Sequence, residues 1–204
     1  MREYFPTRSL QEYARWKVRI DPVYAAALEH LRGHHEPVLD VGCGVGLLAF
    51  YLREHGYDGP LLGIDYDPKK IAVAQQVAKH YRDIEFRLFD AREPMPAGHN
   101  VVLLDTLQYV DTASQNIILA NAARAVPQGG VAILRQGIAD GSWRHRFTAF
   151  VDQAGRAIRW HKGESLIYPT REQLTRAFAG FEMHALPMWG RTPYNNYLFV
   201  FRRR

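Results

Sequence analysis

The sequence contains a single cysteine and no long hydrophobic run, and each of these absences excludes a class of protein. Because Cys43 is the only cysteine among 204 residues, no intrachain disulfide can form, which favours a cytoplasmic location. The longest apolar runs, such as Val101 to Leu104, are too short to span a bilayer. The first residues lack the apolar stretch of a signal peptide. We therefore expect a cytoplasmic protein without a membrane span.

The charge is positive but not extreme. The formal net charge is +5 and the isoelectric point is about 9.4. This balance is compatible with an acidic partner, but it does not require nucleic acid. Hydrophobic residues make up 47% of the chain, so a single domain with a sizeable core is expected.

A glycine-rich stretch, Val38 to Gly46, organises the rest of the chain. A short apolar run ends on Gly42, Gly44 and Gly46, and an amphipathic segment follows at once. This pattern indicates a buried strand, a tight turn and the start of a helix. Glycine permits positive φ and a close approach of the backbone to a ligand, and the helix start offers free N–H groups. We expect a cofactor site at the carboxyl end of this strand.

Apolar and amphipathic segments alternate on either side of this stretch. The expected strands cover residues 38–41, 61–64, 84–88, 101–104, 131–134, 181–187 and 194–201. The expected helices cover residues 45–54, 68–81, 112–126, 143–154 and 171–178, with two more before residue 35, the second capped by Asp21 and opened by Pro22. Strands separated by helices indicate a doubly wound, mostly parallel α/β sheet of the Rossmann-like class.

Three carboxylates follow strands of this sheet. Asp65 lies 23 residues beyond Gly42, where an acidic residue can accept hydrogen bonds from both hydroxyls of a ribose. Asp90 follows the third strand and can meet an adenine amino group, and Asp105 ends the fourth strand. Any one of them alone could be a helix cap or a turn residue. The prediction of a cofactor site therefore depends on all three following strands of the same sheet as the glycine stretch.

Two features of the glycine stretch discriminate between cofactors. The spacing is not the G-x-G-x-x-G of dinucleotide enzymes, and Asp40 lies two residues before the first glycine. A carboxylate there suits an ammonium group and opposes a pyrophosphate. The loop also has no lysine, which excludes a P-loop site. These features favour an amino-acid-bearing nucleoside over NAD.

The motifs together resemble those of class I S-adenosylmethionine-dependent methyltransferases. The resemblance covers about residues 36–136: the glycine stretch, Gly63 to Asp67, Phe89 to Ala91, Leu103 to Leu107, and Pro127 to Val131. It implies a seven-stranded sheet whose last strand is antiparallel. It also implies S-adenosylmethionine as cofactor and S-adenosylhomocysteine as product. We expect one domain, with a helical cap (1–35), a cofactor-binding core (36–136) and an acceptor-side segment with the C-terminal strands (137–204).

The resemblance implies cofactor contacts at matching positions. Gly42, Cys43 and Gly44 are expected at the methionine portion through their backbone, with Asp40 beside the ammonium group. The other expected cofactor residues are Asp65 at the ribose, Tyr66, Asp90 and Ala91 at the adenine, and Leu107 and Tyr109 on the fourth-strand side. Leu107 also suits core packing. Tyr13 is assigned either to the core or to a lid over the site.

The acceptor is expected to be small and apolar or aromatic, with methyl transfer to oxygen favoured. No Asn-Pro-Pro-Tyr motif follows the fourth strand, which disfavours methylation of exocyclic base amines, and no His, Cys or Asp cluster has metal-ligand spacing. Aromatic residues are frequent outside the core region, as in an apolar pocket. His145 is the first candidate for a general base, and the other candidates are His161, Tyr194 and Tyr109.

The sequence leaves more than one binding partner and more than one class of function open. Arginines are dense beyond residue 140, which indicates either a solvated basic face or an anionic partner such as an acidic acyl carrier protein in a lipid, polyketide or pigment pathway. An RNA methyltransferase is the second hypothesis and a non-catalytic cofactor-binding protein the third. An NAD-linked oxidoreductase is disfavoured by Asp40 and the glycine spacing.

Overall fold

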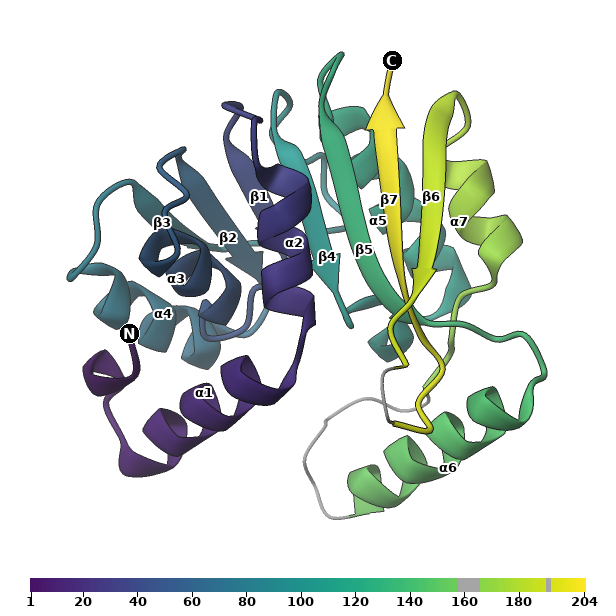
Figure 1. The fold of residues 1–204 in the computed structure, drawn as a ribbon, viewed down its shortest axis with the longest axis horizontal. Coiled ribbons are helices and arrows are strands. Elements are labelled where there is room, and N and C mark those ends of the chain that lie inside the picture. The colour runs from purple at the N-terminus through teal and green to yellow at the C-terminus, as the bar shows by residue number, and fades with distance from the viewer. Residues whose placement is uncertain (158–165, 190–191) are drawn as a thin grey trace.

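The seven strands form one sheet with helices on both faces (Figure 1). The computed structural model describes residues 1–157, 166–189 and 192–204, and the side chains of residues 152–157 are not described. The strands are β1 (Val38–Val41), β2 (Leu61–Asp65), β3 (Ile84–Leu88), β4 (Asn100–Leu104), β5 (Val131–Gly137), β6 (Phe181–Pro187) and β7 (Asn196–Arg203). The α-helices are α1 (Arg8–Ile20), α2 (Val23–Leu31), α3 (Leu47–Glu54), α4 (Pro68–Ala78), α5 (Thr112–Ala125), α6 (Trp143–Ala157) and α7 (Arg171–Ala177). Two short 3-10 helices, η1 (Arg2–Tyr4) and η2 (Leu107–Tyr109), complete the elements of the described residues.

The strand order places β1 in the middle of the cofactor half of the sheet. The order is β3-β2-β1-β4-β5-β7-β6, with β1 parallel to β2 on one side and to β4 on the other. Val41 pairs with Ile64 and with Leu103, so the carboxyl ends of three strands meet at one point. The chain reverses its direction of travel through the sheet there, which is where open α/β sheets bind their ligands.

The last strand is antiparallel, as the sequence predicts. β7 runs antiparallel to both β5 and β6. Phe199 and Phe201 pack on the face that α5 and α7 cover, and Val200 packs on the face covered by α2, α3 and α4. This alternation gives each face of the sheet its own apolar core, and the predicted fold class is confirmed.

Most element boundaries differ from the sequence prediction by one to three residues, and two of the differences have a clear physical reason. Helix α2 begins at Val23 rather than Pro22, although the Asp21 carboxylate still accepts a hydrogen bond from the Val23 N–H at 3.2 Å. Strand β5 continues to Gly137, three residues beyond the predicted end, because it pairs with β7 as far as the Gly137–Asn196 pair. Such a pairing between distant segments leaves no local signal. Among the described residues, no helix has the length and apolar character needed to span a membrane.

Candidate active site

The glycine loop between β1 and α3 is held by backbone contacts and by close packing. The N–H groups of Gly42 and Cys43 both donate to the Ile64 carbonyl, at 2.8 and 3.0 Å. Gly42 has φ +75°, and a Cβ added there would lie 2.6 Å from Cγ2 of Thr106. Gly44 has φ +57° with nothing within 4 Å of a Cβ position. Gly42 is therefore required for packing, whereas Gly44 borders open space in which a ligand can approach the backbone.

Asp65, at the end of β2, ties this loop to the neighbouring strand. Its Oδ2 accepts a hydrogen bond from the Gly44 N–H and its Oδ1 accepts one from the Asp67 N–H, both at 2.9 Å. Each carboxylate oxygen can accept a further hydrogen bond. Asp65 therefore fixes the loop conformation and retains the capacity to accept hydrogen bonds from ribose hydroxyls.

Asp40 is a buried carboxylate without a full set of partners. Its side chain is 5% exposed, and Oδ2 is buried with no hydrogen-bond partner in the described structure. Burial, followed by the charge of Asp65, raises the pKa of Asp40 to about 7. Burial and then the same two carboxylates also raise the pKa of the Cys43 thiol. A buried acceptor of this kind fits a cation, and an ammonium group satisfies both its charge and its free oxygen.

On the predicted adenine side of the site, the Asp90 carboxylate is already paired with Arg92. The Asp90 carboxylate accepts hydrogen bonds from Nε and Nη2 of Arg92, at 3.0 and 2.5 Å, and these bonds lower the pKa of Asp90. Ala91 is anchored through its carbonyl, which accepts a hydrogen bond from Nδ2 of Asn121 at 3.1 Å. Tyr66 is 70% exposed beside β2. The adenine contacts of these three predicted residues stay predictions.

Comparison with known proteins identifies the family. The model of a family described as "Methyltransferase domain" matches residues 38–130, which include the glycine loop, Asp65 and Asp90. Residues 38–130 of the chain therefore match this methyltransferase family, which supports the class I S-adenosylmethionine-dependent group inferred from the motifs. The resemblance inferred from the motifs is thereby confirmed. S-adenosylmethionine is the cofactor of this family, as predicted, and the orphaned Asp40 oxygen and the open side of Gly44 fit its ammonium group.

Individual relatives agree with this assignment. The chain is 30% identical over 173 residues to the "Ubiquinone biosynthesis O-methyltransferase" of Azorhizobium caulinodans, a match that covers 79% of this chain and 64% of that protein. This methyltransferase chain therefore spans less than two thirds of its curated relative. An O-methyltransferase family protein from Burkholderia thailandensis has the same fold, with a TM-score of 0.74, 16% identity and coverage of 98% of this chain and 61% of that one. The magnesium protoporphyrin IX methyltransferase from Synechocystis PCC 6803, solved with bound SAH, matches with a TM-score of 0.71, 18% identity and coverage of 100% and 97%.

A buried arginine that the sequence reasoning missed lies on the β4–β5 side of this methyltransferase site. Arg135, near the end of β5, forms ion pairs with Asp105 at the end of β4 and, at 2.9 Å, with Asp21. Lys17 of α1 donates to the same Asp21 oxygen at 2.7 Å. Burial lowers the pKa of Arg135, but Asp105 and Asp21 raise it more, so the net shift is upward. Burial raises the pKa of Asp21, but Arg135 and Lys17 lower it more, so the net shift is downward. This network joins the N-terminal helices to the carboxyl ends of β4 and β5.

Asp105 occupies an unusual backbone position within this network. Its φ is +53°, and Asp83 is the only other described non-glycine residue with a positive φ. The Asp105 side chain is 30% exposed. The next residue, Thr106, donates from its hydroxyl to the Val41 carbonyl at 3.2 Å and packs on Gly42. Asp105 is thus a partly exposed carboxylate next to the glycine loop. The only sequence signal for the network was a single arginine directly after the apolar run Val131 to Leu134 of β5.

The remaining predicted site residues belong to η2, α1 and α6 rather than to the glycine loop. Leu107 is fully buried in the core that α5 and α7 cover, which fits the core-packing alternative, and its cofactor contact stays a prediction. Tyr109 is partly buried in η2, and Tyr13 of α1 is 39% exposed. His145 lies at the start of α6, where its Nδ1 accepts a hydrogen bond from the Gly141 N–H at 3.4 Å and its ring meets the edge of Tyr168. The roles of Tyr109, Tyr13 and His145 stay predictions, and His161 lies outside the described residues.

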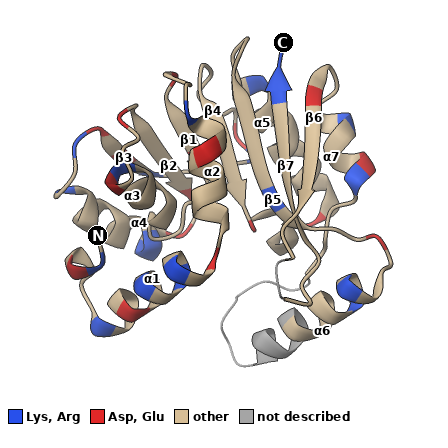
Figure 2. Ribbon diagram, viewed as in Figure 1, with Lys and Arg blue, Asp and Glu red and all other residues tan. Residues whose placement is uncertain are grey.

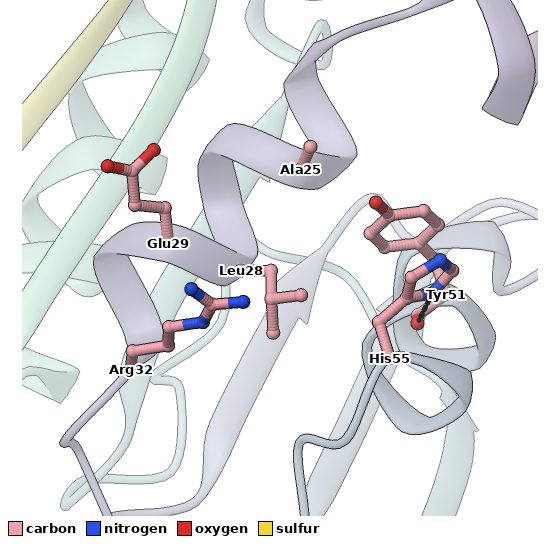
Figure 3. Close-up of a pocket in the computed structure, with 6 residues that line it drawn as sticks. All are labelled: Ala25, Leu28, Glu29, Arg32, Tyr51 and His55. Carbon is pink, nitrogen blue, oxygen red and sulfur yellow. Dashed lines mark hydrogen bonds between the residues drawn. The ribbon is translucent and has the colours of Figure 1, made fainter.

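Further polar groups and a surface hollow lie outside the glycine loop. Three buried side chains near the carboxyl ends of β4 and β5 have polar atoms without a partner in the described structure, namely Gln108, Gln136 and Asn195. A surface hollow between α2 and α3 lies at the C-terminal ends of those helices, away from the glycine loop; it is lined by Ala25, Leu28, Glu29, Arg32, Tyr51 and His55 (Figure 3). The described residues contain no cluster of three or more His, Cys, Asp or Glu side chains that could hold a metal ion.

Proposed function

We propose that this chain transfers the methyl group of S-adenosylmethionine to a hydroxyl oxygen of a small apolar or aromatic acceptor. One observation carries the donor half of the proposal: a buried, unpartnered Asp40 oxygen lies in β1, directly before a glycine loop whose Gly44 is open to a ligand. Asp40 binds the ammonium group, Asp65 the ribose hydroxyls, and the loop N–H groups the methionine portion.

Two observations support oxygen as the methylated atom. The curated relative is named an O-methyltransferase, and the segment after β4 reads Asp105-Thr106-Leu107-Gln108 rather than the motif of base amine methylation. Aromatic side chains surround the carboxyl edge of the sheet, as an apolar acceptor requires, and they belong to Tyr13, Tyr168, Trp189, Tyr194 and Tyr197.

The reaction places few demands on the protein. The cofactor supplies the electrophilic methyl group, and the chain has to hold the acceptor oxygen in line with it and exclude water. We assign the orienting role to Asp105, whose carboxylate accepts a hydrogen bond from the acceptor hydroxyl. The ion pair with Arg135 holds that carboxylate in position. His145 remains the candidate that accepts the proton.

Two measurements test this function. Calorimetric titration with S-adenosylhomocysteine is expected to show one site per chain, and the absence of binding would refute the donor assignment. A methyl-transfer screen scored by mass, with free and carrier-tethered phenols and carboxylic acids, then identifies the acceptor. Transfer to a phenol is the expected result. Transfer only to tethered substrates would assign the basic residues to an acidic carrier protein.

A matched pair of variants tests the role of Asp105. Asp105→Asn keeps the shape and the tolerated positive φ but weakens the hydrogen bond to the acceptor, so kcat/KM for the acceptor should fall roughly 10- to 100-fold. S-adenosylhomocysteine affinity should not change. Asp83→Asn makes the same change at the other positive-φ aspartate and is the control. Equal activity of the two variants would remove Asp105 from the site.

The other two function classes have their own signatures. An RNA methyltransferase should bind bulk RNA with steep salt dependence. A non-catalytic cofactor-binding protein should bind S-adenosylhomocysteine and transfer no methyl group to any acceptor in the screen.

A further inference from the structure

Two helices lie at the same edge of the sheet as the glycine loop. Figure 1 shows α1 and α6 beyond the carboxyl ends of the parallel strands, one below the β1–β3 half and the other below the β5–β7 half. The acceptor of the proposed reaction approaches from this edge, because the cofactor loop and Asp105 lie there. The surfaces of these two helices therefore bear on how the acceptor arrives.

Helix α1 carries an apolar stripe that the protein core does not cover. Leu10, Ala14 and Val18, spaced by four, pack against the core. A second stripe, spaced by three and four, is left exposed: Tyr13 at 39%, Trp16 at 61% and Ile20 at 52%. A soluble helix ordinarily exposes polar side chains at such positions.

Helix α6 repeats this arrangement. Its packed side is fixed by Thr148, whose hydroxyl accepts a hydrogen bond from the Asn195 N–H at 2.8 Å, and by Arg144, which donates to the Thr192 carbonyl at 2.7 Å. A stripe spaced by four and three is exposed: Trp143 at 57%, Phe147 at 38% and Phe150 at 72%. These two stripes hold six of the 11 large hydrophobic side chains that the described structure exposes.

The same two helices concentrate the positive charge of the chain. By sequence, α1 has four basic residues and one acidic residue, and α6 has three basic residues and one acidic residue. Their combined excess equals the +5 net charge of the whole chain. Figure 2 shows basic positions along α1 and on α6. The guanidinium of Arg144 lies 4.7 and 4.6 Å from the ring centres of Trp143 and Trp189.

We propose that the exposed faces of α1 and α6 form one docking surface for a lipid bilayer with anionic headgroups, and that the acceptor is a lipophilic molecule dissolved in that bilayer. The substrate part of this proposal rests on the proposed function. Aromatic side chains with one apolar and one polar end favour the membrane interface, and each nearby Lys or Arg adds about 1 kcal/mol of attraction to an anionic leaflet.

Other occupants fit the surface less well. A second copy of the chain would bring two basic faces together, which is unfavourable. An acidic carrier protein would match the charge, but it would leave the six exposed apolar side chains without a function. A bilayer uses both the stripes and the charge.

Vesicle co-sedimentation tests the surface. The wild-type chain should bind vesicles of phosphatidylcholine and phosphatidylglycerol at least tenfold more tightly than vesicles of phosphatidylcholine alone. The double variant Ile20→Ser, Phe150→Ser removes one apolar side chain from each helix and should lose at least tenfold in binding. Ile117→Ser removes a side chain of similar exposure, 46%, from α5 and is the matched control, with no change expected. Brominated lipid should quench the tryptophan fluorescence of the wild-type chain, which simple electrostatic adsorption would not produce.

Several outcomes would overturn the proposal. These are no binding to either kind of vesicle, equal binding by the double variant, or a concentration-dependent dimer or an acidic carrier complex that the double variant abolishes. Calorimetry with S-adenosylhomocysteine separates this result from the proposed function. The double variant should keep wild-type affinity, whereas a wild-type chain that binds vesicles but no S-adenosylhomocysteine would refute the function and retain the surface.

Discussion

Substitution of Asp40 by asparagine tests the cofactor site, because the buried carboxylate of Asp40 destabilises the folded protein once it is ionised. The folded-state pKa of Asp40 is about 7, raised from 3.8 by burial and by Asp65. The folded state therefore holds a proton more tightly than the unfolded chain, and stability contributed by this group is lost as the pH rises from about 4 through 7. A shift of roughly three pKa units corresponds to at most about 4 kcal/mol at pH 8. Asp40→Asn cannot ionise, so it should be more stable than wild type at pH 8 by up to that amount and similar at pH 4.

The cofactor reverses this relation, because an ammonium group stabilises the ionised carboxylate. Asp40→Asn should weaken S-adenosylhomocysteine binding by about 10- to 100-fold, the range expected for losing a hydrogen bond to a charged group. In wild type at pH 6, titrations in buffers of different ionisation enthalpy should show release approaching one proton per ligand bound. Asp58→Asn, an exposed site, is the control and should change neither stability nor affinity. Lower stability of Asp40→Asn at pH 8, or binding without proton release, would refute the reasoning.

The remaining predictions concern the loop and the buried arginine. Gly42→Ala should lower the free energy of unfolding by 2 kcal/mol or more in chemical denaturation, because its Cβ meets Thr106 at positive φ, and a cost below about 1 kcal/mol would contradict the contact. Gly44→Ala should cost only about 1 kcal/mol in stability, because there is space for the Cβ, but it should weaken S-adenosylhomocysteine binding in calorimetry. Arg135→Met leaves Asp21 and Asp105 without their shared cation and should cost about 3–5 kcal/mol near pH 7, with part of the loss recovered when the pH is lowered and these carboxylates are protonated.

The donor half of the site could be predicted from the sequence because its residues are close together along the chain or lie at strand ends in fixed phase. Gly42, Gly44 and Asp65 sit where a strand-turn-helix unit and the next parallel strand must place them. The Gly44–Asp65 hydrogen bond follows from that local geometry.

The acceptor side could not be predicted in the same way. The Arg135–Asp21 ion pair joins residues 114 positions apart, and the sequence pattern around either residue does not indicate the other. The extension of β5 to Gly137 depends on a partner strand near residue 200. Leu107 shows the complementary difficulty, since one apolar residue after β4 fits both a pocket wall and the core that it occupies.

The antiparallel pairing of β7 with β5 also has a consequence for how the chain is made. Strands β1 to β5 and the glycine loop are complete once Gly137 has been synthesised, and they pair among themselves. The outer edge of β5 receives its partner only when Asn196 to Arg203 have left the ribosome. Until then the unpaired N–H and C=O groups along the edge of β5, which is apolar from Val131 to Leu134, are open to other nascent chains. A ribosome that pauses between these two segments therefore holds a chain with the strands of its donor half complete and the outer edge of β5 uncovered.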